Sequence, residues 1–345
     1  MIGRVMLGKF TAVPILLLCC CATFVACDRD KETAHAGTQT PTAPAADPVA
    51  SKLSLPPDNG PAPAIDSNRT MKYVKEIVAY GPRPLGSANH KKVEDYLLAH
   101  LKGDVVENDI FAADTPEGKF PVHNIVAKFP GKKDGLVVIA SHYDTNYPLR
   151  NTSYVGANDG GSSSALLLEL ANQLRGKARD GYSIWLVWDD AEEAMKPDTE
   201  TPFMDNSLYG ITHLAEKWQA DGTLKRIKAF ILADMIGDAD LSVDRDTNST
   251  AWVEDVVYEA ATRLGYQSHF FARTLPGVSD DHIPFVKRGV PSADLIDFDY
   301  GYNDVFWHTT QDTVDKLSPK SLEIVGSTIL ETVGILDKMD PLPPK

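Results

Sequence analysis

Cysteine is absent from this sequence after residue 27. All four cysteines, Cys19, Cys20, Cys21 and Cys27, lie in the N-terminal segment. The rest of the chain therefore has no thiol that could form an intramolecular disulfide or bind a metal ion. Any metal site in that part must use histidine and carboxylate ligands.

An excess of basic residues is also absent. The 345 residues include 34 Lys and Arg against 48 Asp and Glu, which gives a formal net charge of −14. Because phosphate binding requires clustered Lys and Arg, we expect no nucleic-acid partner. After the first thirty residues no segment has ~18 or more consecutive apolar residues, so we expect no transmembrane helix there. The hydrophobic fraction of 43% is enough for one large core.

The N-terminus has the pattern of a targeting segment. Arg4 and Lys9 precede a short apolar stretch over 10–24. The following Phe24–Val25–Ala26–Cys27 resembles a bacterial lipoprotein signal, although Phe24 departs from the usual leucine. This resemblance implies a signal peptide over 1–27 and an exported protein, periplasmic or on the cell surface, held at the membrane by a lipid on Cys27. The alternative is a plain secretory signal.

Residues 28–67 are rich in Pro, Ala and Thr and have few large apolar side chains. Such a composition predicts a disordered tether. We therefore expect a single folded domain over 68–345.

Strands and helices alternate along that domain. The apolar patterns predict strands over 105–111, 123–129, 136–140, 184–188, 229–233 and 293–296. Helices are expected over 69–80, 89–101, 162–174, 208–218, 251–264, 283–287 and 321–336. This alternation indicates an α/β fold: a mostly parallel central mixed sheet with helices on both faces.

Residues that can bind a metal ion follow the ends of these strands. In such sheets the site lies outside the carboxyl ends of the strands, so we expect these residues to converge. Histidine, aspartate and glutamate are zinc ligands. The residues concerned are His142, Asp159, Glu192, Glu193, Asp234 and His308.

Several residues in and near this set also have an ordinary structural explanation. Asp159 precedes a helix and suits an N-cap, and Asp281 could cap the helix that follows it. The acidic run 189–193 could be a solvated loop, but its four carboxylates repel one another unless a cation is near. Trp307 could belong to the core or could form a wall beside His308. The order and the shared strand-end position of the residues favour a site.

The same motifs resemble those of the zinc aminopeptidase family, which includes the animal-type glutaminyl-peptide cyclotransferases (glutaminyl cyclases). The resemblance covers roughly 69–338 and implies a zinc exopeptidase-like fold. The motifs shared by both branches are Ser141–His142–Tyr143–Asp144, Asn158–Asp159, Glu192–Glu193, Asp234–Met235–Ile236–Gly237 and His308–Thr309. Segments closer to the cyclases are Thr115–Pro116–Glu117–Gly118, Ser207–Leu208–Tyr209–Gly210, the stretch from Asp280 to Phe285, and Trp307–His308–Thr309.

By resemblance to the cyclases, one zinc ion would be bound by Asp159, Glu193 and His308. The enzyme would convert the N-terminal glutamine of peptides or proteins to pyroglutamate with release of ammonia. Catalysis would depend on Glu192 as general acid/base, with Asp234 and Asp280 in its hydrogen-bond network. The substrate would contact Trp307, with Tyr300 and Tyr302 as further candidates.

By resemblance to the aminopeptidases, two zinc ions would be bound. His142 and Asp234 would then join the ligands, Asp159 would bridge the two ions, and Glu192 would activate water to hydrolyse the first peptide bond. A third possibility is a metal-free binding module of the same fold.

The sequence also departs from the animal cyclases in residues near the site. The loop 195–206 has no Trp, and Ser141 and Ser164 stand where those cyclases have a cysteine pair. We therefore expect the walls of the pocket to differ.

Overall fold

The structure, a computed structural model, describes residues 53–58, 60–197 and 199–343. The predicted signal peptide, Cys27 and the first part of the predicted tether lie outside these residues. Within the described part of the chain, no helix is long and apolar enough to cross a membrane.

A six-stranded mixed sheet forms the centre of the fold, in the order β1-β2-β4-β3-β5-β8. Strands β3 (Lys133–His142), β4 (Tyr182–Asp189), β5 (Ile227–Asp234) and β8 (Ser292–Ile296) are parallel to one another. Strand β2 (Gly118–Phe129) runs antiparallel to β4 and forms a hairpin with β1 (Val105–Thr115) at the edge. The predicted, mostly parallel mixed sheet is confirmed.

Side chains of the sheet alternate between two apolar cores, as the two-residue repeat of a strand requires. On β3, Val137 and Ile139 face the larger core, whereas Val138 and Ala140 face the smaller one. The larger core includes side chains of α1 (Ser67–Val78), α2 (Ala88–His100), α3 (Gly161–Leu174), α5 (Ala251–Arg263) and α7 (Pro319–Lys338). The smaller core includes α4 (Tyr209–Ala220) and α6 (Ile283–Val286).

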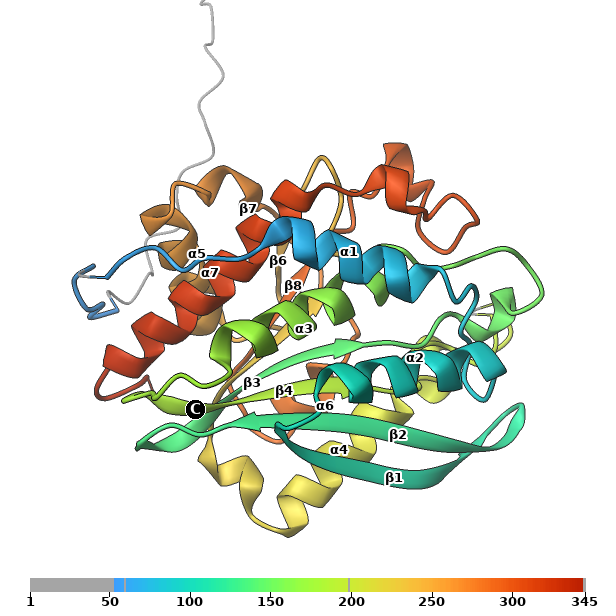
Figure 1. Ribbon diagram of the computed structural model, residues 1–345, viewed down its shortest axis with the longest axis horizontal. Coiled ribbons are helices and arrows are strands. Elements are labelled where there is room, and N and C mark those ends of the chain that lie inside the picture. The colour runs from blue at the N-terminus through green and yellow to red at the C-terminus, as the bar shows by residue number, and fades with distance from the viewer. Residues whose placement is uncertain (1–52, 59, 198, 344–345) are drawn as a thin grey trace, which may run out of the picture. The chain divides into compact units, whose positions relative to one another are not determined.

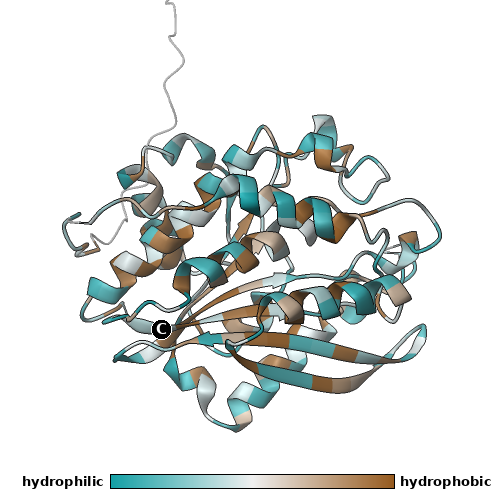
Figure 2. Cartoon of the chain, viewed as in Figure 1, coloured by the Kyte–Doolittle hydropathy of each residue, from teal (hydrophilic) through white to brown (hydrophobic). Residues whose placement is uncertain are grey.

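The arrangement of these layers is visible in the figures. Helices α1, α2, α3 and α7 lie on one side of the sheet (Figure 1). Hydrophobic residues concentrate on the central strands and on the helix faces turned toward them (Figure 2). Because both faces are covered, the central strands consist of nearly continuous apolar residues.

A second, two-stranded parallel sheet was not predicted. It pairs β6 (Val243–Asp246) with β7 (Phe270–Leu275) and lies beside β8. Strand β6 has the sequence Val-Asp-Arg-Asp, which has no apolar run or alternation to reveal it. Short 3-10 turns complete the fold: Tyr147–Leu149, Phe203–Asp205, Thr223–Arg226, Gln267–His269, Tyr302–Asp304 and Val314–Lys316.

The last part of the predicted tether lies on the folded body. Leu53, Leu55 and Ile65 pack against the larger core. The guanidinium of Arg263 on α5 donates a hydrogen bond to the carbonyl of Pro56 (2.5 Å). Residues before 68 thus also pack on the folded body, and Ile65 approaches Gly326 of α7.

Candidate active site

Three residues predicted to bind a metal meet at the carboxyl edge of the sheet. The Nε2 atom of His308 lies 3.3 Å from an oxygen of Asp159 and 3.3 Å from an oxygen of Glu193. Their ligand atoms all lie within 4.8 Å of one another. Glu193 comes from the loop after β4, Asp159 from the loop before α3, and His308 from the loop after β8. Three separate loops therefore form one compact group of an imidazole and two carboxylates.

A second group of this kind shares Asp159 with the first. Nε2 of His142 lies 3.1 Å from the other oxygen of Asp159 and 3.3 Å from an oxygen of Asp234. Both ring nitrogens of His142 are buried and have no hydrogen-bond partner of good geometry. The structure thus brings together all five predicted ligand positions, with Asp159 between the two groups.

The charges of the site are strongly coupled. Burial alone would lower the pKa of His142, but Asp234, Asp144 and Asp159 outweigh it and raise this pKa well above its usual range. For His308, Glu193 and Asp159 have the same effect against burial, so its pKa is also well above the usual range. Burial would raise the pKa of Asp159, yet the two histidines hold it well below its ordinary value. The site therefore stabilises positive charge next to Asp159.

Glu192 lies beside these two groups of candidate ligands, in a different environment from that of Glu193. Burial, followed by repulsion from Asp280 and Glu193, raises the pKa of Glu192 well above its usual range. Its carboxyl atoms lie within 4.8 Å of those of Asp280 and Asp281. Glu192 is thus a buried carboxyl that holds a proton more readily than an exposed glutamate, as proton transfer near neutral pH requires.

Asp144 positions the two adjacent glutamates. Its two oxygens accept hydrogen bonds from the backbone N–H groups of Glu192 (3.3 Å) and Glu193 (3.4 Å). The same carboxylate lies 3.5 Å from Nδ1 of His142, where it can fix the orientation of the imidazole ring. One carboxylate therefore contacts residues from both groups of candidate ligands.

Several residues of the site have left-handed backbone conformations. The φ angles are 59° at Ala191, 48° at Met235 and 50° at His308. Non-glycine residues adopt this region at a cost, and such residues cluster at functional sites. Ala191 directly precedes Glu192, Met235 directly follows Asp234, and the third residue is His308 itself. The backbone is therefore strained at the positions that orient the side chains of the site.

Residues that hold Asp159 in place were missed by the sequence analysis. The hydroxyl of Tyr154 donates to an oxygen of Asp159 (2.5 Å), and Asp312 accepts the backbone N–H groups of Asn158 and Asp159 (2.8 and 3.2 Å). The fully buried Arg83 donates to the carbonyls of Tyr143, Val155, Gly156 and Asp159. In sequence the motif Gly81–Pro82–Arg83–Pro84 indicates the end of a helix. An arginine among prolines and a glycine is the one signal that could have pointed to this role.

A pocket of about 600 Å³ opens above these groups. Its floor includes Asp159, Glu192, Glu193, Asp234, Asp280 and His308. Its apolar walls include Trp307, which stacks on His308 with ring centroids 4.3 Å apart, together with Phe298 and Phe203. Pockets of this size enclose most of a ligand larger than one amino-acid residue.

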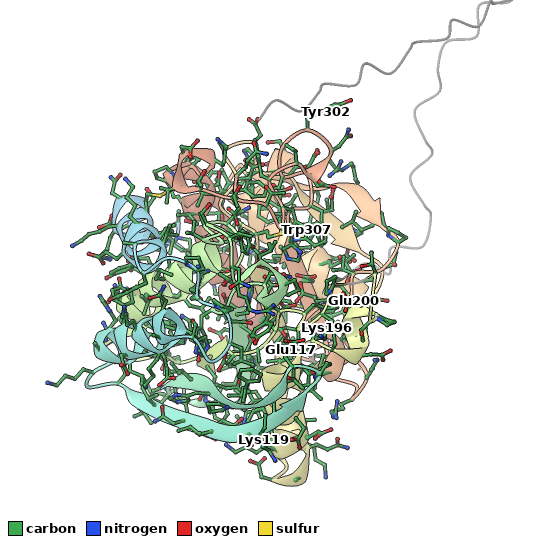
Figure 3. All side chains as sticks on the ribbon, turned by 90° about the vertical axis from the view of Figure 1, so that its right-hand side faces the viewer. Glu117, Lys119, Lys196, Glu200, Tyr302 and Trp307 are labelled. Atoms are coloured by element: carbon green, nitrogen blue, oxygen red, sulfur yellow. The ribbon has the colours of Figure 1, made fainter. Side chains whose placement is uncertain are left out.

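The two tyrosines predicted to contact substrate lie elsewhere. The side chain of Tyr300 is fully buried, and its hydroxyl donates to Asp312 (2.6 Å), behind the loop that carries Asp159. Tyr302 is 87% exposed and lines a separate acidic hollow with Asp238, Asp240 and Asp299. Figure 3 shows Tyr302 well apart from Trp307. Neither tyrosine lines the pocket. Burial and hydrogen bonding to Asp312 decide the position of Tyr300, and neither can be read from a sequence.

The other two carboxylates of the acidic run are buried beneath the site. Asp190 lies 2.6 Å from the imidazole of His90 and accepts the backbone N–H of His123. Asp189 has no hydrogen-bond partner of good geometry, and burial raises its pKa to about 7 beside Asp281. The run is therefore not a solvated loop.

Comparison with known proteins agrees with this geometry. The model of peptidase family M28 matches residues 124–333, more than half of the chain. A glutaminyl-peptide cyclotransferase of Drosophila melanogaster is 31% identical over 258 residues, which cover 67% of this chain and 70% of the relative.

Solved structures give the same result. The crystal structure of an Acidobacteriales bacterium glutaminyl cyclase matches with a TM-score of 0.77 and 45% identity, over 82% of this chain and 98% of that one. A Zn-dependent exopeptidase from Parabacteroides distasonis matches with a TM-score of 0.72 and 27% identity, over 81% of this chain and all of that one. The resemblance that the motifs indicated is confirmed. The chain belongs to peptidase family M28 and, within it, is related to enzymes named glutaminyl-peptide cyclotransferases.

Proposed function

We propose that this enzyme is a zinc-dependent glutaminyl-peptide cyclotransferase, which converts the N-terminal glutamine of peptides or proteins to pyroglutamate and releases ammonia. The observation that supports this most is Glu192. Its buried carboxyl has a raised pKa and lies beside the group Asp159, Glu193 and His308, at the floor of a pocket larger than one residue. The relatives named as cyclotransferases agree with this assignment.

The donor atoms of the site suit zinc. Imidazole nitrogen and carboxylate oxygen are its usual protein ligands in the absence of cysteine. One oxygen of Glu193 is buried without any hydrogen-bond partner, while Asn146 donates to the other (2.8 Å). A buried unpaired carboxylate oxygen is costly unless a cation binds it. Asp159, Glu193 and His308 would therefore hold the ion, which when bound would polarise the side-chain amide carbonyl of the substrate glutamine.

The remaining chemistry is proton transfer within the pocket. The α-amine nitrogen of the substrate attacks the carbon of its own side-chain amide, a C–N bond forms in the new ring, and the bond to the amide NH₂ breaks. Glu192 takes the proton that the amine loses and delivers it to the departing NH₂, which leaves as ammonia. A carboxyl oxygen of Asp280 lies within 4.8 Å of one of Glu192, and burial, then repulsion from Asp234, raises the pKa of Asp280 well above the usual range.

The second group of ligands favours one alternative, a two-zinc aminopeptidase. His142, Asp159 and Asp234 would hold the second ion, and their ligand atoms lie as close together as those of the first group. Glu192 would then take a proton from the water that attacks the first peptide bond. The similar structure of a Zn-dependent exopeptidase supports keeping this candidate.

Mass spectrometry of two peptides separates the candidates. The zinc-loaded protein would be incubated with a peptide that begins with glutamine and with one that begins with leucine. Loss of 17 mass units (about one ammonia) from the glutamine peptide alone is expected for the cyclotransferase. Removal of the first residue from either peptide would contradict it and favour the aminopeptidase. A protein that takes up no zinc would contradict both.

We also propose that the enzyme is exported and tethered by a lipid on Cys27. Support comes only from the signal-like sequence over 1–27. Metabolic labelling with a fatty acid should mark the wild-type protein and not the Cys27→Ser variant. A protein that is exported but unlabelled would indicate a plain secretory signal.

A further inference from the structure

We propose that Lys196 makes this pocket select peptides that carry an acidic side chain on the second, third or fourth residue. This inference rests on the proposed cyclotransferase function and concerns the part of the substrate beyond the reacting glutamine. Three observations support the proposal: the charge of the pocket lining, the position of Lys196 on its loop, and an ion pair from which Lys196 can turn to a substrate.

The charge of the lining is one-sided. Among the described residues that line the pocket, Lys196 is the only lysine or arginine, whereas Asp159, Glu192, Glu193, Asp234 and Asp280 supply carboxylates. The carboxylates lie at the floor, with the metal ligands. Apart from His308, which the proposed zinc would bind, Lys196 is therefore the one side chain of this lining that can attract a substrate carboxylate, whereas the carboxylates of the floor repel it.

Lys196 is held on a closed loop. The backbone N–H of Met195 donates to the carbonyl of Asn206 (3.0 Å), and that of Lys196 donates to the side-chain oxygen of Asn206 (2.6 Å). The amide group of Asn206, which is fully buried, also donates to the carbonyls of Thr201 and Pro202. Such a loop with its ends tied together is an Ω-loop. It presents Lys196 at a fixed place.

The position of Lys196 relative to the metal ligands sets its reach along the substrate. Only three peptide units separate it from Glu193, so their Cα atoms are at most about 11 Å apart. An extended substrate advances about 3.4 Å per residue. The ammonium group can thus meet a side chain on the second, third or fourth residue of a peptide whose first residue lies at the metal.

The present partner of Lys196 can be exchanged. Its ammonium forms an ion pair with Glu117, in the turn between β1 and β2, and the two side chains are 31% and 19% exposed. Figure 3 shows both at the pocket side of the molecule, together with Trp307. Arg150 lies 3.7 Å from Glu117, so Glu117 keeps a cation when Lys196 turns to a substrate. Exposed pairs of this kind contribute little to stability and exchange readily.

The test compares two glutamine peptides with amidated C-termini, one with glutamate at the third position and one with glutamine there. We expect kcat/KM of the wild-type enzyme to be about two- to five-fold higher for the acidic peptide at low salt. The ratio should fall toward one in about 0.5 M salt, because the pair is accessible to screening ions. The general negative field of the protein acts on the acidic peptide alone, so the ratio for Lys196→Met is compared with that for a variant that loses the same charge outside the pocket.

Two variants should move this ratio in opposite directions. Lys196→Met should bring it to one or below, because only the repulsion from the floor remains. Glu117→Gln should raise it, because Lys196 then has no competing carboxylate. Loss of a purely structural ion pair would change both variants in the same direction. Lys119→Met is the matched control: Lys119 lies on the same hairpin, is 64% exposed, pairs with Asp114 and does not line the pocket. Its ratio should equal that of the wild type.

The outcomes for the two proposals are distinct. A wild-type ratio of one, or a preference that survives in Lys196→Met, would overturn the role of Lys196 while cyclisation of the neutral peptide still supports the enzyme function. If neither peptide is cyclised, the proposed function fails, and calorimetric binding of the same two peptides still decides whether Lys196 selects the acidic one. Should Lys196→Met not fold, an unchanged ratio in Glu117→Gln would be sufficient to reject the inference.

Discussion

The substitution Arg83→Lys tests how the loop that carries Asp159 is held. Arg83 is fully buried and donates hydrogen bonds to four backbone carbonyls from three nitrogens spread over its planar guanidinium. Burial lowers the pKa of Arg83, and the charges of nearby acidic groups oppose this effect. Lysine has one nitrogen with three donors at a single point. It can serve about two of the carbonyls, which leaves about two without a partner.

The expected cost follows from those two carbonyls. A buried acceptor left unsatisfied costs about 1–3 kcal/mol, so Arg83→Lys should lose about 2–6 kcal/mol of unfolding free energy. That is a large share of the roughly 5–15 kcal/mol that stabilises a typical domain. Because Asp159 is one of the residues held, zinc affinity should also fall, by about 10- to 100-fold.

Urea denaturation measures the first effect, and competition with a chromophoric chelator measures the second. Arg226→Lys serves as control, since Arg226 is 54% exposed and pairs at the surface with Asp134, which is 94% exposed. It should lose less than about 1 kcal/mol and keep its zinc affinity. If Arg83→Lys lost no more stability than this control and bound zinc equally well, the reasoning about the buried guanidinium would be refuted.

Three further predictions concern individual site residues. Glu192→Gln should keep its zinc but lose at least about 100-fold in kcat, since only the proton carrier is removed; a near-normal rate would show that another group carries the proton. His308→Ala should bind zinc far more weakly, and unchanged metal content by mass spectrometry would remove His308 from the ligands. Burial raises the pKa of Asp189 from 3.8 to about 7, so ionisation of this carboxyl lowers the free energy of unfolding. This loss is absent below about pH 4, grows between about pH 4 and pH 7, and is constant at higher pH. Relative to wild type, Asp189→Asn should therefore gain up to about 4 kcal/mol in unfolding free energy between pH 4 and pH 8, and a pH-independent difference would contradict this.

The sequence was sufficient to predict the sheet and the convergence of the candidate ligands because both depend on local patterns. Continuous apolar runs such as 136–140 identify buried parallel strands, and residues just after their ends must meet at one edge. His142 and Asp234, the last residues of β3 and β5, lie where this rule places them. The small sheet β6–β7 escaped prediction because it pairs a short polar strand with a distant one, and its sequence has no pattern of its own.

Contacts between distant segments account for the rest of what the sequence did not reveal. The roles of Arg83 and Asp312 depend on backbone groups that lie 60 or more residues away from them in the chain. Phe203 lines the pocket only because Asn206 closes the loop that carries it. The aromatic content near Trp307 suggested Tyr300 and Tyr302, but the fold turns one inward to Asp312 and the other to solvent.

The closed loop between Met195 and Asn206 has a consequence for re-engineering this enzyme. Its ends are joined by backbone and side-chain hydrogen bonds to Asn206, so Glu192 and Glu193, which precede it, are held independently of its interior. Lengthening such a loop costs only about 0.6 kcal/mol for each doubling of its length. The interior from Thr199 to Met204 is therefore a replaceable module: grafting other sequences between the same two ends should produce enzymes that share one catalytic floor and accept different peptides.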